Sequence, residues 1–241
     1  MHGLASAIRF LTVIPVGRGD WFDARSALPF FPLAGLLIGV CVAGVDALAA
    51  QLWPAPAAAL VDVVALAAIT GALHLDGLAD AADGLYGNRP PEQALAIMKD
   101  SRIGAMGMVV VVCCLALKWA GLAGIGANRM LWMLIVVSLA RSTALFGIKF
   151  LPYGRAEGGT GRTFFQNPLR FVDFWGVGLI ALLSLCAGWR AVVVLFSFGL
   201  LLMAVLAFYR RRIGCITGDM LGALIETTEA GLFMIIAAWS S

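Results

Sequence analysis

The chain has 241 residues, of which 61% are hydrophobic and only 13% are charged, and its mean hydropathy is +0.94. Soluble domains carry about 25% charged residues, so this composition excludes an ordinary soluble globule and indicates an all-α protein built from transmembrane helices. The net charge of +3 comes from basic residues spread over separate segments, a distribution that argues against a surface for nucleic acid.

Seven apolar segments are long enough to cross a bilayer, which requires about 20 residues of α-helix. The predicted spans are Leu28–Ala50, Ala57–Leu75, Gly104–Gly124, Met130–Phe150, Phe171–Gly188, Ala191–Tyr209 and Met220–Trp239. A preceding apolar segment, Leu4–Val16, is shorter and contains Arg9, so we expect an interfacial or re-entrant helix there. No internal repeat and no soluble domain is apparent, and residues 1–241 are expected to form one integral-membrane domain.

The basic residues predict how these spans are oriented. With the N-terminus in the cytoplasm, all but four of the 17 Lys and Arg residues fall on the cytoplasmic side of the predicted spans. The four exceptions are Lys118, Arg129, Arg141 and Arg190. Because loops rich in Lys and Arg stay in the cytoplasm, we predict an N-in, C-out topology.

The five cysteines lie mostly within apolar runs; they are Cys41, Cys113, Cys114, Cys186 and Cys215. No pair of them has the spacing of metal ligands, and their number is odd, which argues against a disulfide framework. We therefore expect them to be buried packing residues.

Three aspartates, Asp76, Asp80 and Asp83, follow closely on one another at the cytoplasmic end of the second predicted span, in the stretch His74–Leu85. Their spacing of i, i+4 and i+7 places all three on one face of a helix. Like charges at this spacing repel one another, so a cation or basic side chains should lie beside them. Oxygen donors without cysteine suit Mg²⁺ or Mn²⁺.

A second acidic cluster, Asp219, Glu226 and Glu229, begins at the cytoplasmic end of the last predicted span. The apolar residues after it, Ala230–Trp239, are too few to cross a bilayer, so the span must include both glutamates. Carboxylates at membrane depth normally face a cavity or the bundle interior and have a function; the alternative, a protonated glutamate bonded between helices, applies to at most one of them. The candidate metal ligands are Asp76, Asp80, Asp83, Asp219, Glu226 and Glu229.

Three further polar residues lie near these clusters, and each has two interpretations. Lys99 and Arg102, in the stretch Met98–Gly104, either hold phosphate oxygens or reflect only the general excess of positive charge in cytoplasmic loops. His74 stands before Asp80 on the same helix and either acts as a base or ligand or has a packed structural role.

Arg141 lies in the middle of a predicted span, where pairing with an acid inside the membrane is expected. Asp46 and Asp62 also lie within spans, so either of them is an alternative partner to the clustered carboxylates. The glycine-rich loop Pro152–Arg162 is flanked by arginines and could bind phosphate through backbone N–H groups, although it does not match the P-loop pattern.

Three stretches together, His74–Leu85, Met98–Gly104 and Thr217–Glu229, resemble the signatures of the cobalamin synthase (adenosylcobinamide-GDP ribazoletransferase) family. The N-terminal stretch Arg9–Val16 and the loop that begins at Pro152 are also similar to that family, and the motifs occur in the family's order from about residue 8 onward. One position departs from the family pattern, because Cys215 stands where a second glycine is expected.

The resemblance implies a Mg²⁺-dependent enzyme of the cytoplasmic (inner) membrane, with its active site on the cytoplasmic face. Such an enzyme transfers adenosylcobinamide phosphate from adenosylcobinamide-GDP to α-ribazole, or to its 5′-phosphate, and releases GMP. Two Mg²⁺ ions, or Mn²⁺ in their place, are expected at the pyrophosphate. Its partners would be these substrates and membrane lipid, with homo-oligomerisation left open.

The expected roles of the residues follow from this reaction. Asp76, Asp80, Asp219 and Glu226 are the predicted metal ligands, with Glu229 as a further ligand or a support for one. Asp83 is the predicted base for the incoming hydroxyl. Lys99 and Arg102 are expected to hold phosphate oxygens.

Two other functions are weighed against this one. A CDP-alcohol phosphatidyltransferase would carry all its aspartates in one stretch with an arginine soon after the first Asp-Gly, and no arginine follows Asp76-Gly77 at that offset. A cation- or proton-coupled transporter would also carry acids within the membrane, but here the acids concentrate toward one face and no inverted repeat is apparent.

Overall fold

The computed structural model describes residues 2–16, 22–126, 128–155 and 160–239, and within these ranges the chain is helical, with a single isolated β-bridge between Tyr153 and Ile216. Arg18 and the middle of the glycine-rich loop lie outside the described residues. The helices are α1 (His2–Leu11), α2 (Ala24–Ala27), η1 (Leu28–Phe30), α3 (Phe31–Leu52), α4 (Ala55–Ile69), α5 (Leu73–Leu85), α6 (Pro91–Ile97), α7 (Ala105–Gly124), α8 (Arg129–Phe150), η2 (Thr160–Phe165), η3 (Phe171–Phe174), α9 (Trp175–Ser184), η4 (Leu185–Ala187), α10 (Trp189–Arg212) and α11 (Gly218–Ala237).

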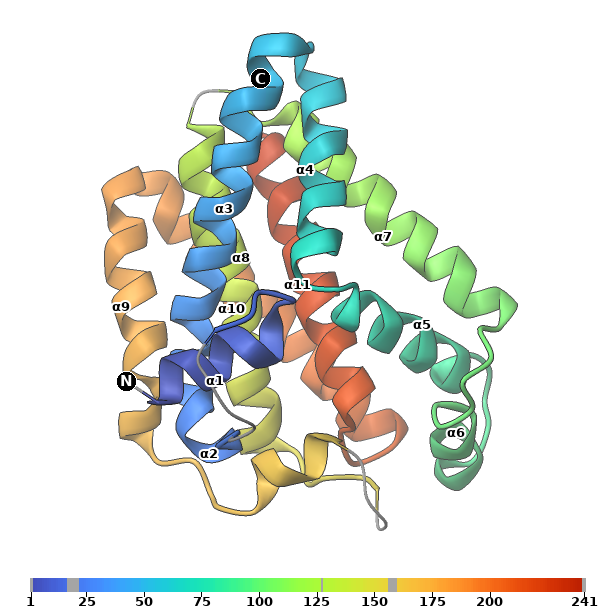
Figure 1. Ribbon diagram of the computed structural model, residues 1–241. Coiled ribbons are helices and arrows are strands. Elements are labelled where there is room, and N and C mark those ends of the chain that lie inside the picture. The colour runs from blue at the N-terminus through green and yellow to red at the C-terminus, as the bar shows by residue number, and fades with distance from the viewer. Residues whose placement is uncertain (1, 17–21, 127, 156–159, 240–241) are drawn as a thin grey trace.

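Two helices, α8 and α11, form the centre of the bundle and are buried along most of their length, whereas α7 and α10 expose most of theirs (Figure 1). Helix α3 packs along α8. Their contact depends on small residues. A methyl group on Gly35 would lie 2.8 Å from the Cα atom of Ser138, and one on Gly39 would lie 2.8 Å from the Cα atom of Leu134. Small residues at such positions let two membrane helices approach each other closely.

Among the described residues, five helical segments are long and apolar enough to cross a membrane, and α4 with α5 would make a sixth if the two count as one broken span. They are Ala24–Leu52, Ala105–Gly124, Arg129–Phe150, Trp189–Arg212 and Gly218–Ala237. The expected span over Phe171–Gly188 is divided into η3, α9 and η4, and forms only a short apolar helix. The structure therefore establishes a helical bundle with five or six candidate spans.

The expected second span is interrupted after Ile69. Gly71 and Ala72 have φ angles of 58° and 56°, in the left-handed region, and α5 leaves at 89° to α4. The prediction that Ala57–Leu75 is one continuous span is therefore wrong at its end. Because of this bend, α5 lies across α11 instead of continuing toward the end of the bundle (Figure 1).

The N-terminal segment is a part of the bundle. Helix α1 buries Ala7, Ile8 and Leu11 against its neighbours, and the backbone N–H of Val13 donates to the carbonyl of Ile69 at the bend between α4 and α5. This contact places the segment that follows α1 beside the bend at which α5 begins.

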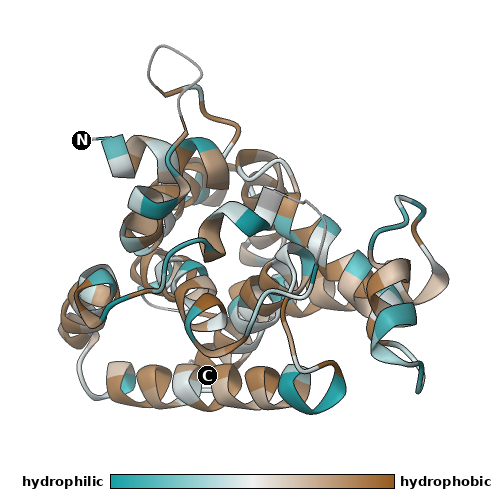
Figure 2. Cartoon of the chain, turned by 90° about the horizontal axis from the view of Figure 1, so that it is seen from below, coloured by the Kyte–Doolittle hydropathy of each residue, from teal (hydrophilic) through white to brown (hydrophobic). Residues whose placement is uncertain are grey.

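The end of the bundle that carries α1, α2 and α6 is seen in Figure 2. Hydrophilic stretches lie there on loops and helix ends, around helices that are mostly hydrophobic. The cysteines are all free, but only Cys114 is buried, and Cys113 and Cys186 are exposed on the outer surface. The prediction of five buried cysteines is wrong for those two, because the outer surface of a membrane bundle is itself apolar and an apolar run does not imply burial.

Candidate active site at the crossing of α5 and α11

The two acidic clusters come from helices that cross in close contact. A methyl group on Gly77 of α5 would lie 2.9 Å from the carbonyl oxygen of Asp219, and one on Gly222 of α11 would lie 3.1 Å from that of His74. Larger side chains at either glycine would push the helices apart. The absence of these side chains therefore brings the acidic end of α5 to the beginning of α11.

Asp76, Asp80 and Asp219 meet at this crossing, and their negative charges act on one another. Asp219 lies in the first turn of α11, where Thr217 caps the helix by accepting the N–H of Met220 at 3.2 Å. An arginine compensates part of the charge, because Arg155 forms an ion pair with Asp219 at 2.5 Å. The three aspartates thus form one acidic group drawn from distant parts of the chain.

A cavity of about 300 Å³ opens beside the acidic group. Its lining includes the polar residues Arg9, His74, Asp76 and Asp219. It also includes apolar residues of α1, α3, α8, α11 and η2, among them the aromatic side chains Phe10, Phe31 and Phe164. The cavity therefore has both apolar walls and carboxylates.

Asp83 takes a different direction from the other two aspartates of α5. Its carboxylate accepts the backbone N–H of Gly104 at 2.7 Å and that of Gly107 at 2.8 Å. These N–H groups belong to the first turn of α7, which begins at Ala105, so Asp83 caps that helix from outside. Methyl groups on either glycine would come within 2.4 Å of a carboxylate oxygen of Asp83.

Lys99 and Arg102 lie on the surface between α6 and α7. Arg102 is 87% exposed and forms an ion pair with Asp100 at 2.6 Å. Hydrogen bonds from Arg102 lower the pKa of Asp100 to about 2. Lys99 is exposed as well. Neither residue lines the cavity, whereas Arg155, which also donates to the carbonyl of Met98 at 3.1 Å, contacts the acidic group directly.

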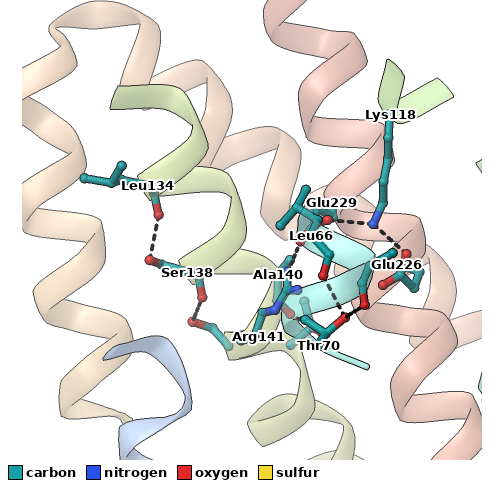
Figure 3. Close-up of polar contacts among 12 residues, drawn as sticks. Leu66, Thr70, Lys118, Leu134, Ser138, Ala140, Arg141, Glu226 and Glu229 are labelled. Atoms are coloured by element: carbon teal, nitrogen blue, oxygen red, sulfur yellow. Dashed lines mark hydrogen bonds and ion pairs between the residues drawn. The ribbon is translucent and has the colours of Figure 1, made fainter. Parts of the chain in front are cut away.

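Glu226 and Glu229 lie two and three turns deeper along α11, in a buried cluster of charges (Figure 3). Lys118 of α7 reaches between them and donates to Glu226 at 2.5 Å and to Glu229 at 2.6 Å. Arg141 of α8 forms an ion pair with Glu229. The expectation that Arg141 pairs with an acid inside the membrane is confirmed, and the structure does not bring these glutamates to Asp76 and Asp80.

The other acids within the expected spans form a separate group. Arg129, at the start of α8, pairs with Asp46 and lies 3.8 Å from Asp62. Asp46 and Asp62 are therefore not the partners of Arg141. This group is at the opposite end of α8 from the acidic crossing.

Comparison with known proteins agrees with the motifs. The model of the cobalamin-5-phosphate synthase family matches residues 3–237. The chain is similar to the adenosylcobinamide-GDP ribazoletransferase of Herpetosiphon aurantiacus (36% identical, over 98% of this chain and 96% of the relative). It is also similar to the enzyme of the same name from Roseiflexus sp. (39% identical, over 94% of this chain and 85% of the relative). The one from Syntrophobacter fumaroxidans is 38% identical, over 96% of this chain and 96% of the relative. No solved structure matches the chain.

The chain belongs to the cobalamin-5-phosphate synthase family.

For a cobalamin-5-phosphate synthase, the donor set at the crossing fits a divalent cation in its chemistry. Asp76, Asp80 and Asp219 offer only oxygen atoms, which Mg²⁺ prefers, and their mutual repulsion calls for positive charge beyond that of Arg155. Among the described residues, however, no three His, Cys, Asp or Glu side chains converge closely enough to enclose a metal ion. The ligand sets predicted from the sequence stay predictions.

Three contributors to this family member's polar interior lie outside the predicted site. The predicted topology puts Lys118 on the outer side, yet it is only 3% exposed; its position inside an otherwise apolar run is the available signal. Arg9 lines the cavity, although in the sequence it only interrupts an apolar segment. Arg155 is predicted as a flank of the glycine-rich loop, and its pairing with Asp219 spans 64 residues, a separation that no local pattern reveals.

Proposed function

We propose that this chain transfers adenosylcobinamide phosphate from adenosylcobinamide-GDP to a hydroxyl of α-ribazole, or of its 5′-phosphate, and releases GMP. The relatives named adenosylcobinamide-GDP ribazoletransferase, matched over nearly the whole chain, support this activity. The single structural observation that carries it is the meeting of Asp76, Asp80 and Asp219 beside a cavity. An acidic group next to a binding chamber is what a phosphoryl transfer requires.

The reaction needs positioning and compensation of charge more than covalent chemistry by the protein. A ribazole hydroxyl attacks the phosphorus on the cobinamide side, the bond from that phosphorus to the bridging oxygen breaks, and GMP leaves with the electron pair. Arg155, which pairs with Asp219, would hold oxygens of the pyrophosphate. Asp76 is exposed and lines the cavity, so its carboxylate accepts the proton of the attacking hydroxyl.

Magnesium would be held by Asp80 and Asp219, and it supplies positive charge beside the pyrophosphate oxygens when bound. The contacts of the remaining predicted site residues favour supporting roles. Both oxygens of Asp83 already accept N–H groups, which suits a residue that positions α7. Glu226 and Glu229 are neutralised by Lys118 and Arg141, which suits residues that hold α11 in register.

The same proposal includes seven passes with the N-terminus in the cytoplasm, the C-terminus outside and the active site at the cytoplasmic face of the inner membrane. Supporting it, α1 lies in the lower half of the bundle while α11 ends at the upper end (Figure 1). Helix α9 packs beside α3 and α8 and, with α4–α5, supplies the two passes beyond the five long helices. The exposed basic residues Arg210 and Arg211 end α10 at the lower end, as expected for the cytoplasmic side.

The test is release of GMP from adenosylcobinamide-GDP by the purified protein in detergent or lipid, with α-ribazole and Mg²⁺ present. Asp80→Asn and Asp219→Asn are expected to lower kcat at least about 100-fold, because each removes a charge that holds the cation. Glu92→Gln, an exposed acid on α6, is the matched control and should retain normal turnover. Absence of GMP release by the unaltered protein, or normal turnover by Asp219→Asn, would contradict the proposal.

A further inference from the structure

The cavity beside the acidic group is lined both by phenylalanines and by carboxylates, and we infer that it binds the ribazole nucleoside, with its planar base against the phenylalanines and its ribose toward the carboxylates. This inference rests on the proposed function and assigns one of the two substrates to a defined part of the site. It also orients that substrate relative to the acidic group.

The volume of the cavity decides between the two substrates. Pockets for small molecules measure about 300–1,000 Å³, and this cavity, at about 300 Å³, is at the lower limit. A single nucleoside is of suitable size, whereas a cobalt corrin with its side chains and nucleotide is several times larger. The corrinoid substrate must therefore stay outside the chamber.

The surface next to the cavity suits the diphosphate of that larger substrate. An open groove of about 390 Å³ is lined by Tyr153, Arg155, Arg162, Phe165 and Gln166. Two of its five lining residues are arginines, which bind phosphate oxygens well. The groove adjoins the cavity, because Arg155 pairs with Asp219, a lining residue of the cavity. A diphosphate in the groove would thus lie beside the acidic group.

A cluster of three phenylalanines in the lining of the cavity suits a flat aromatic ring. Phe164 packs edge-on against Phe10, with ring centroids 4.8 Å apart, and against Phe31 at 5.8 Å. All three rings line the cavity. Aromatic walls stabilise a bound ring through stacked or edge-to-face contacts, and stacking of this kind accepts bases without requiring a particular hydrogen-bond pattern.

The acidic wall of the cavity is formed by Asp76 and Asp219. Asp76 is exposed, so its carboxylate is accessible to a ligand. Ionised carboxylates accept hydrogen bonds from hydroxyl groups, and a ribose offers several. His74 also lines the cavity, but both of its ring nitrogens are buried and its imidazole lies near the charges of Arg141 and Glu226, so it is not assigned to the ribose. A nucleoside with its base against the phenylalanines would direct its ribose toward Asp76 and Asp219.

The decisive measurement separates the two substrates. Phe164→Leu is expected to raise the KM for α-ribazole about tenfold, because the base loses its aromatic wall, and to leave the KM for adenosylcobinamide-GDP unchanged within twofold. Phe196→Leu is the matched control, since Phe196 is 65% exposed on the outer surface of α10; it should change neither constant. A rise in the KM for adenosylcobinamide-GDP instead, or no change in either, would overturn the assignment.

A binding experiment keeps the inference testable when turnover fails. Equilibrium dialysis of labelled α-ribazole against the unaltered protein, without the second substrate, should show saturable binding at one site per chain, weakened at least tenfold by Phe164→Leu. Ribose 5-phosphate, which lacks the base, should compete at least 30-fold more weakly than α-ribazole. Equal competition by ribose 5-phosphate would refute the aromatic site, whereas ribazole binding without any release of GMP would refute the proposed reaction alone. If Phe164→Leu fails to fold, Phe31→Leu replaces it in both experiments.

Discussion

Replacing Lys118 with methionine tests whether the buried charge cluster stabilises the bundle. Lys118 donates to Glu226 at 2.5 Å and to Glu229 at 2.6 Å, and Arg141 supplies the second positive charge. Methionine keeps most of the length of the side chain and its apolar character but removes the ammonium group. The change therefore leaves two carboxylates with a single cation.

The expected loss follows from the burial of these groups. The four side chains are between 0% and 4% exposed, so the charge left over has little access to water. Removing one partner of a buried ion pair costs about 3–5 kcal/mol, against about 0–1 kcal/mol for a pair on the surface. A glutamate that has lost its cation can take up a proton instead. The expected loss in the free energy of unfolding is therefore about 3 kcal/mol. For a chain of this size, that corresponds to a fall in Tm on the order of 10 °C.

Thermal unfolding of the purified protein, followed by tryptophan fluorescence in one detergent, measures this loss. Lys99→Met is the matched control, because Lys99 is exposed in the loop before α7; its Tm should change by no more than about 2 °C. Adding Glu226→Gln to Lys118→Met removes the unpaired charge and should restore part of the stability. If Lys118→Met lowers the Tm no more than Lys99→Met does, the cluster is hydrated and the reasoning fails.

Three further changes probe the acidic crossing. Asp83→Asn should lower the stability by about 1–3 kcal/mol, since an amide accepts only one of the two N–H groups now bound; a loss of turnover at unchanged Tm would instead identify Asp83 as a base. Gly77→Ala should abolish most turnover, because its methyl group would lie 2.9 Å from the carbonyl oxygen of Asp219, whereas Gly44→Ala, with nothing within 4 Å, should be harmless. Removal of divalent cations with EDTA should stop GMP release, and Mg²⁺ or Mn²⁺ should restore it; full activity in EDTA would exclude the cation.

Much of the helical architecture could be predicted because its causes are local. A run of about 20 apolar residues forms a membrane helix whatever surrounds it, and the two acidic clusters follow from spacing along a helix. The motifs of the family are likewise contiguous in the sequence. Hydropathy carries no information about a bend, so it does not predict the break between α4 and α5. That break depends on two residues in the left-handed region, one of them the non-glycine Ala72.

The sequence by itself determined the class of protein, the two acidic clusters and the family, because each is encoded in neighbouring residues. Only the tertiary structure decided which charges meet. It brings Asp76 and Asp80 close to Asp219 at a crossing lined by glycines. In the same bundle, Glu226 and Glu229 form ion pairs with Lys118 and Arg141. The physical reason is that all six expected carboxylates look alike along the chain. Their roles depend on which cation lies within hydrogen-bond distance, and that is set by how α5, α7 and α8 pack on α11.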